Sequence, residues 1–154
     1  MIRHATDSDA GALLRLIADF NDVDQHDHDD ARIRAALAPL LTPNPFGIVL
    51  ILEIAGQPQG YAVLTWGYSL ESGGIEALVD EIFVRDRGQG LGAQLLAACV
   101  REATEHGARI IFLETERANS RVRAFYARHG YTRVGTLQYV LGRGRHENHV
   151  LVGP

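Results

Sequence analysis

The chain has 154 residues, of which 46% are hydrophobic and 22% charged, and we expect residues 1–154 to form a single globular domain. Its fifteen basic residues are all arginine, which excludes a Schiff-base lysine and a Walker-type phosphate loop. The net charge of −4 argues against non-specific nucleic-acid binding, and no apolar run approaches the roughly 20 residues that span a bilayer. Cys99 is the single cysteine, so no internal disulfide can form. A chain with one free thiol fits a reducing compartment, and we expect a cytoplasmic protein without membrane or nucleic-acid partners.

The first half of the chain predicts two helices followed by three strands. Residues 1–6 are expected to form a short strand, and Thr6 or Asp7 could cap a helix whose apolar residues recur at helical spacing up to Phe20. The stretch 19–30 contains six aspartates and two histidines, and a second helical pattern then runs to Leu41. Residues 48–54 and 61–68 read as antiparallel strands joined by a turn at 56–60, and 77–84 read as a third strand.

The second half predicts alternating helices and strands. A helix is expected from Leu91 to about His106, a strand covered on both faces at 110–113, and a short helix that Asn119 caps and that runs to His129. Strand-like segments follow at 131–134 and 137–141, and residues 143–154 are expected to form a loose tail or an edge strand. This order predicts the α+β class, in an α/β/α layered arrangement with a mixed sheet and helices on both faces.

The turn Arg87-Gly88-Gln89-Gly90-Leu91-Gly92 carries the clearest functional indication. A glycine-rich turn that leads into a helix offers unpaired backbone N–H groups and the positive end of the helix dipole, which together suit a pyrophosphate. The segment Gly88–Ala93 also fits the G-x-G-x-x-A dinucleotide fingerprint, so the turn alone does not distinguish NAD or FAD from coenzyme A. Against a dinucleotide, the turn follows several strands, and about 60 residues after it are too few for a second mononucleotide half.

Two motifs resemble those of the GNAT superfamily of N-acetyltransferases. In that family a strand is followed by (Arg/Gln)-x-x-Gly-x-(Gly/Ala), which Arg87, Gly90 and Gly92 match. A second family motif, Asn-x-x-x-x-x-aromatic-Tyr-x-x-x-Gly-(Phe/Tyr), is matched by Asn119, Phe125, Tyr126, Gly130 and Tyr131. The resemblance covers residues 1 to about 141 in the family's order, and it implies a mainly antiparallel sheet of six or seven strands that splays between strands four and five.

The resemblance implies acetyl-CoA as co-substrate, without a metal. Ile82, Phe83 and Val84 would present backbone groups to the pantetheine arm, and Asn119 would bind an amide of the cofactor or shape its slot. The pyrophosphate would be held by the turn and the first helical turn, which comprise Arg87, Gly88, Gln89, Gly90, Leu91, Gly92 and Ala93.

Acetyl transfer needs a deprotonated amine and a proton for the departing thiolate. The family motif implies that Tyr126, a phenol that is protonated at neutral pH, supplies this proton while also contacting the cofactor. It also implies a strand carboxylate as general base, for which Glu81 is the candidate. Because side chains alternate along a strand, only one of Asp80 and Glu81 is expected to face the slot.

The acceptor is expected to be a primary amine of a small molecule or peptide. In the family, the first two helices and the loop between strands three and four line the acceptor site. Carboxylates and aromatics there would suit a cationic amine, although the acidic segment could equally be a solvated loop. The candidate residues are Asp24, His28, Trp66, Tyr68, Glu71 and Asp80.

Three other possibilities remain at this stage. The fold could serve as an acyl-CoA-binding or regulatory module without turnover, or the turn could belong to an NAD- or FAD-dependent oxidoreductase. Dimers are common in the family, and the tail or the last strands could pair across a homodimer interface. A metal at His26 and His28 is not expected, because no third ordered ligand accompanies them.

Overall fold

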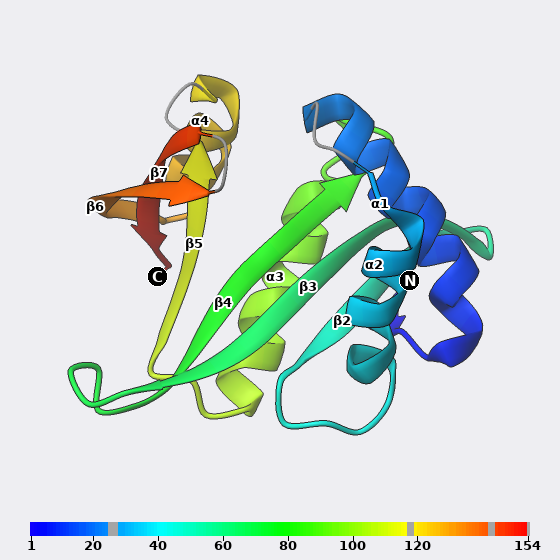
Figure 1. Cartoon of the computed structure of the whole chain (residues 1–154), viewed down its shortest axis with the longest axis horizontal. Coiled ribbons are helices and arrows are strands. Elements are labelled where there is room, and N and C mark those ends of the chain that lie inside the picture. Colours follow the sequence, from blue (N-terminus) through cyan, green and yellow to red (C-terminus); the bar gives the residue numbers. More distant parts are fainter. Residues whose placement is uncertain (25–27, 117–118, 142–143, 154) are drawn as a thin grey trace.

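The computed structural model describes residues 1–24, 28–116, 119–141 and 144–153. Its strands form one seven-stranded sheet in the order β1-β2-β3-β4-β5-β7-β6, in which β4 and β5 are parallel and the other neighbours antiparallel (Figure 1). The strands are β1 (Ile2–His4), β2 (Gly47–Ile54), β3 (Gln57–Ser69), β4 (Gly74–Val84), β5 (Ile110–Glu116), β6 (Thr132–Leu141) and β7 (Gly144–Val152). This mixed α+β sheet confirms the predicted fold class.

Helices cover both faces of the sheet. They are α1 (Ala10–Asp24), α2 (Asp30–Leu37), α3 (Leu91–Glu105) and α4 (Ser120–Arg128), with 3-10 turns at Asp7–Asp9 and Ala38–Leu41. One core lies between the sheet and α1 with α2, and the other lies between the sheet, α3 and Tyr126 of α4. No helix among the described residues is long and apolar enough to cross a membrane.

The β2 strand shows why an unbroken apolar run forms here. Val49 and Ile51 lie in the α1/α2 core, whereas Leu50 and Leu52 lie in the α3 core. Because successive side chains of a strand point to opposite faces, a strand covered on both sides must be apolar at every position. The run therefore places β2 inside the sheet.

An arginine-centred network fixes the start of α1 against the sheet. The Arg3 guanidinium donates to both carboxylate oxygens of Asp9, each at 2.8 Å, and to Glu53 at 2.6 Å. The Asp9 carboxylate also accepts a hydrogen bond from the backbone N–H of the N-cap residue Thr6, as the third residue of a capping box does. The hydrogen bond from Arg3 lowers the pKa of Asp9 to about 2. The network therefore joins β1, α1 and the end of β2.

Several predicted boundaries differ from the structure, and three of the differences change a turn or a whole strand. The turn expected at 56–60 is shorter, because Ala55 and Gly56 take positive φ angles of 49° and 73° and β3 already begins at Gln57. The segments 131–134 and 137–141 form one strand, β6. The expectation of a loose tail or edge strand at 143–154 is wrong for 144–152, since β7 pairs with β5 on one side and β6 on the other.

Candidate active site

A β-bulge in β4 determines where the predicted catalytic carboxylates point. In the β3–β4 pairing Val63 lies opposite Glu81 and Leu64 lies opposite Val79, so Asp80 is the extra residue of the bulged strand. Val79 and Ile82 consequently lie on the α3 side, whereas Phe83 lies in the α1/α2 core. The simple alternation assumed from sequence therefore fails at Asp80.

The sheet opens between β4 and β5 just before this bulge. The described pairing of the two strands covers Glu76 with Ile110, Ala77 with Ile111 and Leu78 with Phe112, and then ends. Beyond this pairing the two strands diverge (Figure 1). β5 runs toward α4 and β7, whereas β4 runs toward α1. The predicted splay between strands four and five is thus confirmed, and the Ile82–Val84 segment borders it on the β4 side.

The glycine-rich turn gives α3 an uncapped N-terminus. Gly88 and Gly90 have φ angles of 91° and 73°, and Gly90 is the N-cap residue in the left-handed conformation. No side chain caps the helix, and its first turn contains no acidic residue. Residues 87–90 are exposed, and a Cβ placed on Gly88 or Gly90 would meet no protein atom within 4 Å. The first N–H groups of the helix are therefore available to an anion.

Glu81 and Asp80 have different environments. The Tyr61 hydroxyl, from the α1/α2 core, donates a hydrogen bond of 2.6 Å to Oε2 of Glu81. The pKa of the Asp80 carboxyl is raised, chiefly because the surrounding protein displaces its water and further because Glu114 of β5 adds negative charge. Asp80 and Glu114 thus interact across the two diverging strands.

Tyr126 lies in the α3 core. Its ring is 5.3 Å from that of Phe125 and 5.6 Å from that of Tyr131, and the residue is 5% exposed. Burial raises the pKa of its hydroxyl, with smaller contributions from Tyr131 and Cys99. The phenol is therefore protonated throughout the physiological pH range and can act as a proton donor. Cys99 is fully buried in the same core, and burial raises the pKa of its thiol to about 12.

Asn119 caps α4. Its side-chain oxygen accepts a hydrogen bond of 3.2 Å from the backbone N–H of Val122. Its amide nitrogen makes no hydrogen bond to the described residues. The cap role is therefore confirmed, and a second contact through the amide nitrogen stays a prediction.

Three of the six predicted acceptor residues, Trp66, Tyr68 and Glu71, lie away from the Ile82–Val84 segment of the opening. Trp66 stacks on His106 at the end of α3, with ring centroids 4.0 Å apart and 12° between the planes. Tyr68 is 76% exposed near the tip of the β3–β4 hairpin and Glu71 lies in that tip, at the other end of β4 from the glycine-rich turn (Figure 1). A register of ten paired residues separates this tip from Val84, so the loop does not contribute to the slot.

Asp80 is the one acceptor candidate that lies at the opening, whereas Asp24 and His28 lie at the α1–α2 connection. Nδ1 of His28 hydrogen-bonds Nδ2 of the buried Asn21 at 3.1 Å, and its Nε2 bonds Asp30 at 2.8 Å, so both ring nitrogens are engaged. The backbone of Asp24 ends α1, but its side chain lies outside the described residues, as do His26 and Asp27. Among the described residues no group of three side chains could hold a metal ion.

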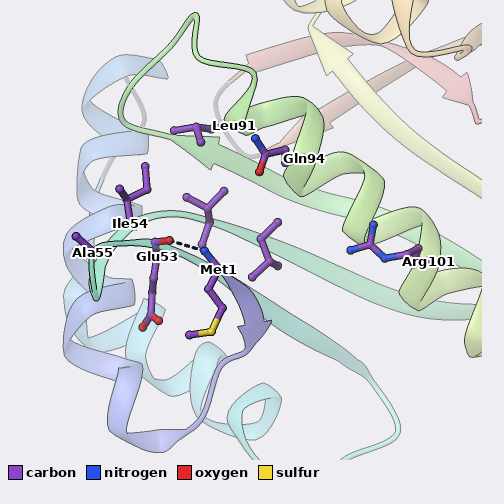
Figure 2. Close-up of a pocket in the computed structure, with 9 residues that line it drawn as sticks. Met1, Glu53, Ile54, Ala55, Leu91, Gln94 and Arg101 are labelled. Carbon is purple, nitrogen blue, oxygen red and sulfur yellow. Dashed lines mark hydrogen bonds between the residues drawn. The ribbon is translucent and has the colours of Figure 1, made fainter.

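A separate hollow of about 460 Å³ lies between α3 and the β1–β2 edge (Figure 2). Figure 2 shows Gln94 and Arg101 of α3 on one side and Ile54 and Ala55 on the other. Of the predicted site residues it includes Leu91 alone, and β3 separates its strands from the β4–β5 opening. We therefore place the candidate active site at the opening.

Sequence reasoning missed three features of the opening. Glu114 has no role in the predicted acetyl-transfer site, because no local pattern connects it with Asp80. Tyr61 was assigned to a strand without a role. The hydroxyl of Thr115 in β5 is buried without a partner among the described residues, and its place just after the apolar run 110–113 was the available signal.

The structure belongs to the class of α+β proteins whose mixed sheet opens between two parallel strands, here β4 and β5. Residues 12–131 match the family model described as the acetyltransferase (GNAT) family, so the chain belongs to that family and is an acetyltransferase. The dinucleotide oxidoreductase alternative is therefore dropped.

Individual relatives agree with this assignment. The chain is 30% identical over 143 residues to an uncharacterised N-acetyltransferase, YhfO, of Bacillus subtilis (strain 168), covering 91% of this chain and 95% of the relative. An integron cassette protein from the Cole Harbour salt marsh metagenome is 30% identical, with a TM-score of 0.78 and coverage of 93% and 89%. A crystal structure described as a putative acetyltransferase from Arthrobacter sp. FB24 is 27% identical, with a TM-score of 0.77 and coverage of 88% and 86%.

Proposed function

We propose that this single-domain protein transfers an acetyl group from acetyl-CoA to a primary amine of a small molecule or peptide, by direct attack of the amine in a ternary complex. The observation that carries the proposal is the uncapped, exposed N-terminus of α3 beside the opening between β4 and β5. A diphosphate needs clustered N–H donors, and an extended pantetheine arm needs a free strand edge. The N-terminus of α3 offers such donors and the end of β4 offers such an edge, and the two are adjacent.

The donor would be bound mainly by backbone groups. The amides of residues 89–93 would hold the pyrophosphate, and the exposed Arg87 would add positive charge at the mouth. The β4 edge at Ile82, Phe83 and Val84 would hydrogen-bond the pantetheine amides, since its described pairing with β5 ends at Leu78. The amide nitrogen of Asn119 would complete the slot. Glycine is needed at 88 and 90 in this proposal, because a Cβ there would project into the open space that the phosphates would occupy.

Tyr126 would supply the proton to the departing thiolate. Its raised pKa keeps the hydroxyl protonated, and its packing against Phe125 and Tyr131 limits the rotamers that its ring can take. When bound, acetyl-CoA supplies the activated acyl group, so the protein needs to orient the amine and move two protons.

Two carboxylates compete for the role of base. Oε2 of Glu81 already accepts a hydrogen bond of 2.6 Å from the Tyr61 hydroxyl, which holds this carboxylate on the side of the α1/α2 core. Asp80 lies in the bulge at the opening, and its raised pKa makes it a better acceptor for an ammonium proton. We therefore propose Asp80 as base beside the originally predicted Glu81, with Glu81 contributing to the binding of the amine.

The negative charge of Asp80, Glu81 and Glu114 near the opening favours a cationic acceptor. A screen of acetyl-CoA consumption, read as thiol release, over amino acids, polyamines, aminoglycosides and peptide N-termini tests the proposal. We expect turnover with at least one primary amine, and N-acetylated product by mass spectrometry. Binding of acetyl-CoA without turnover across this panel would favour the non-catalytic module instead. Cytoplasmic location and a homodimer stay predictions.

A further inference from the structure

Arg85, the first residue after β4, connects three segments of the chain. Its Nε donates to Oδ2 of Asp19 in α1 at 2.7 Å, and its Nη1 donates to the carbonyl oxygen of Pro58 in β3 at 3.1 Å. Its backbone N–H also donates to the carbonyl of Gln59 at 2.9 Å. One side chain thereby joins α1, β3 and the end of the strand that leads into the glycine-rich turn.

A second contact joins the same two segments. Phe20, next to Asp19 in α1, lies with its ring 5.9 Å from that of Phe83, which is on the same face of the chain as Arg85 two residues later. The ion pair and the ring contact are therefore adjacent on both elements. Together they set the position of the C-terminal half of α1 against the end of β4.

The two joined segments lead to different parts of the chain. Downstream of Arg85, Arg87 begins the turn to which we assign the pyrophosphate. Two residues after Asp19, the buried Asn21 bonds His28 and so holds the connection between α1 and α2. A displacement of α1 would therefore be transmitted through Arg85 to the turn.

We propose that Arg85 is a positioning residue that holds the glycine-rich turn in its acetyl-CoA-binding geometry by tying it to Asp19 of α1. This inference rests on the proposed function. Arg85 and Asp19 have side chains 37% and 42% exposed, and such pairs contribute little to stability by themselves. The role of the pair is to fix geometry, so its loss should be seen in cofactor affinity more than in melting temperature.

The dissociation constant of CoA, measured calorimetrically at low salt, tests the inference in the full chain. Arg85→Gln is expected to weaken CoA binding about twofold to fivefold, the range of an exposed ion pair. Asp19→Asn should weaken it by a similar factor, although it removes a negative charge. The double variant should be no weaker than either single variant, because both remove the same contact. Arg85→Lys should recover part of the loss.

The sign of the Asp19→Asn effect separates positioning from charge. If Arg85 acted only as a cation that attracts phosphate, Asp19→Asn would leave CoA binding unchanged or strengthen it, and that result would overturn the inference. Asp22→Asn is the matched control, since Asp22 is an exposed acid of α1 without a partner among the described residues. It should match the wild type. A wild-type protein that does not bind CoA would overturn the proposed function itself, whereas binding that is unaffected in all variants would overturn this inference alone.

Discussion

Replacing Gly90 by alanine tests whether the turn binds the phosphates, because it changes a position that touches no other part of the protein. Gly90 has a φ of 73°, and a Cβ built there meets no protein atom within 4 Å. The left-handed conformation costs an alanine about 1–2 kcal/mol relative to glycine. For a domain of this size, about 1 kcal/mol lowers the melting temperature by about 2–4 °C.

The effect on the cofactor should be much larger than the effect on the fold. The new methyl group would project into the space that we assign to the pyrophosphate and separate it from the first amides of α3. Hydrogen bonds to a charged group contribute about 1.5–3 kcal/mol each. Loss of one such hydrogen bond should raise the dissociation constant of CoA, measured by calorimetric titration, about tenfold to hundredfold.

Gly56 provides a matched control for this substitution. It also has a φ of 73° and no protein atom within 4 Å of a built Cβ, but it lies in the β2–β3 turn. Gly56→Ala should lower the melting temperature as much as Gly90→Ala and leave CoA binding unchanged. Equal CoA affinity in the wild type and both variants would refute the assignment of the phosphates to this turn.

Three further predictions concern catalysis and stability. Tyr126→Phe should lower kcat about a hundredfold or more in steady-state assays while acetyl-CoA affinity stays within twofold, and an unchanged kcat would remove Tyr126 from the acid role. The rate should fall at acidic pH as Asp80 becomes protonated. Glu114→Gln removes a like charge and lowers the pKa of Asp80, so it should shift this acidic limb of the pH–rate profile to lower pH. If the acidic limb is lost in Glu81→Gln but retained in Asp80→Asn, Glu81 is the base. Because the folded pKa of Asp9 is lowered from 3.8 to about 2, its stabilisation is present above pH 4 and lost as the pH falls toward 2. Asp9→Asn should lower the free energy of unfolding, measured with urea near pH 7, by about 1–2 kcal/mol and should reduce the loss of stability between pH 4 and pH 2. If the variant loses as much stability at acidic pH as the wild type, other groups cause that loss.

Elements with strong local patterns were predictable from sequence. The helix at 91–106 and the capped helix after Asn119 follow from apolar spacing and capping residues, and the structure places α3 and α4 there. The glycine-rich turn was predictable for the same reason, because positive φ angles and an open helix N-terminus are properties of the segment itself.

Features that depend on pairing between distant segments were not predictable. The bulge at Asp80 exists because β3 shifts its register between Val63 and Leu64, and no residue of β4 marks it. β7 lies between β5 and β6 although it is last in the chain, which an order of local patterns cannot show. Trp66 was assigned to the acceptor by its place near a loop, but β3 continues through it and presents its ring to His106.

Calorimetric titration of the wild-type protein with CoA and with NADH is the most direct test of the account. Both ligands carry a diphosphate and an adenosine, so they share the chemistry that the N-terminus of α3 recognises. They differ in the pantetheine arm, which needs the opening between β4 and β5. We predict saturable binding of CoA with a stoichiometry near one per chain and no comparable binding of NADH. Binding of NADH without binding of CoA would contradict the account.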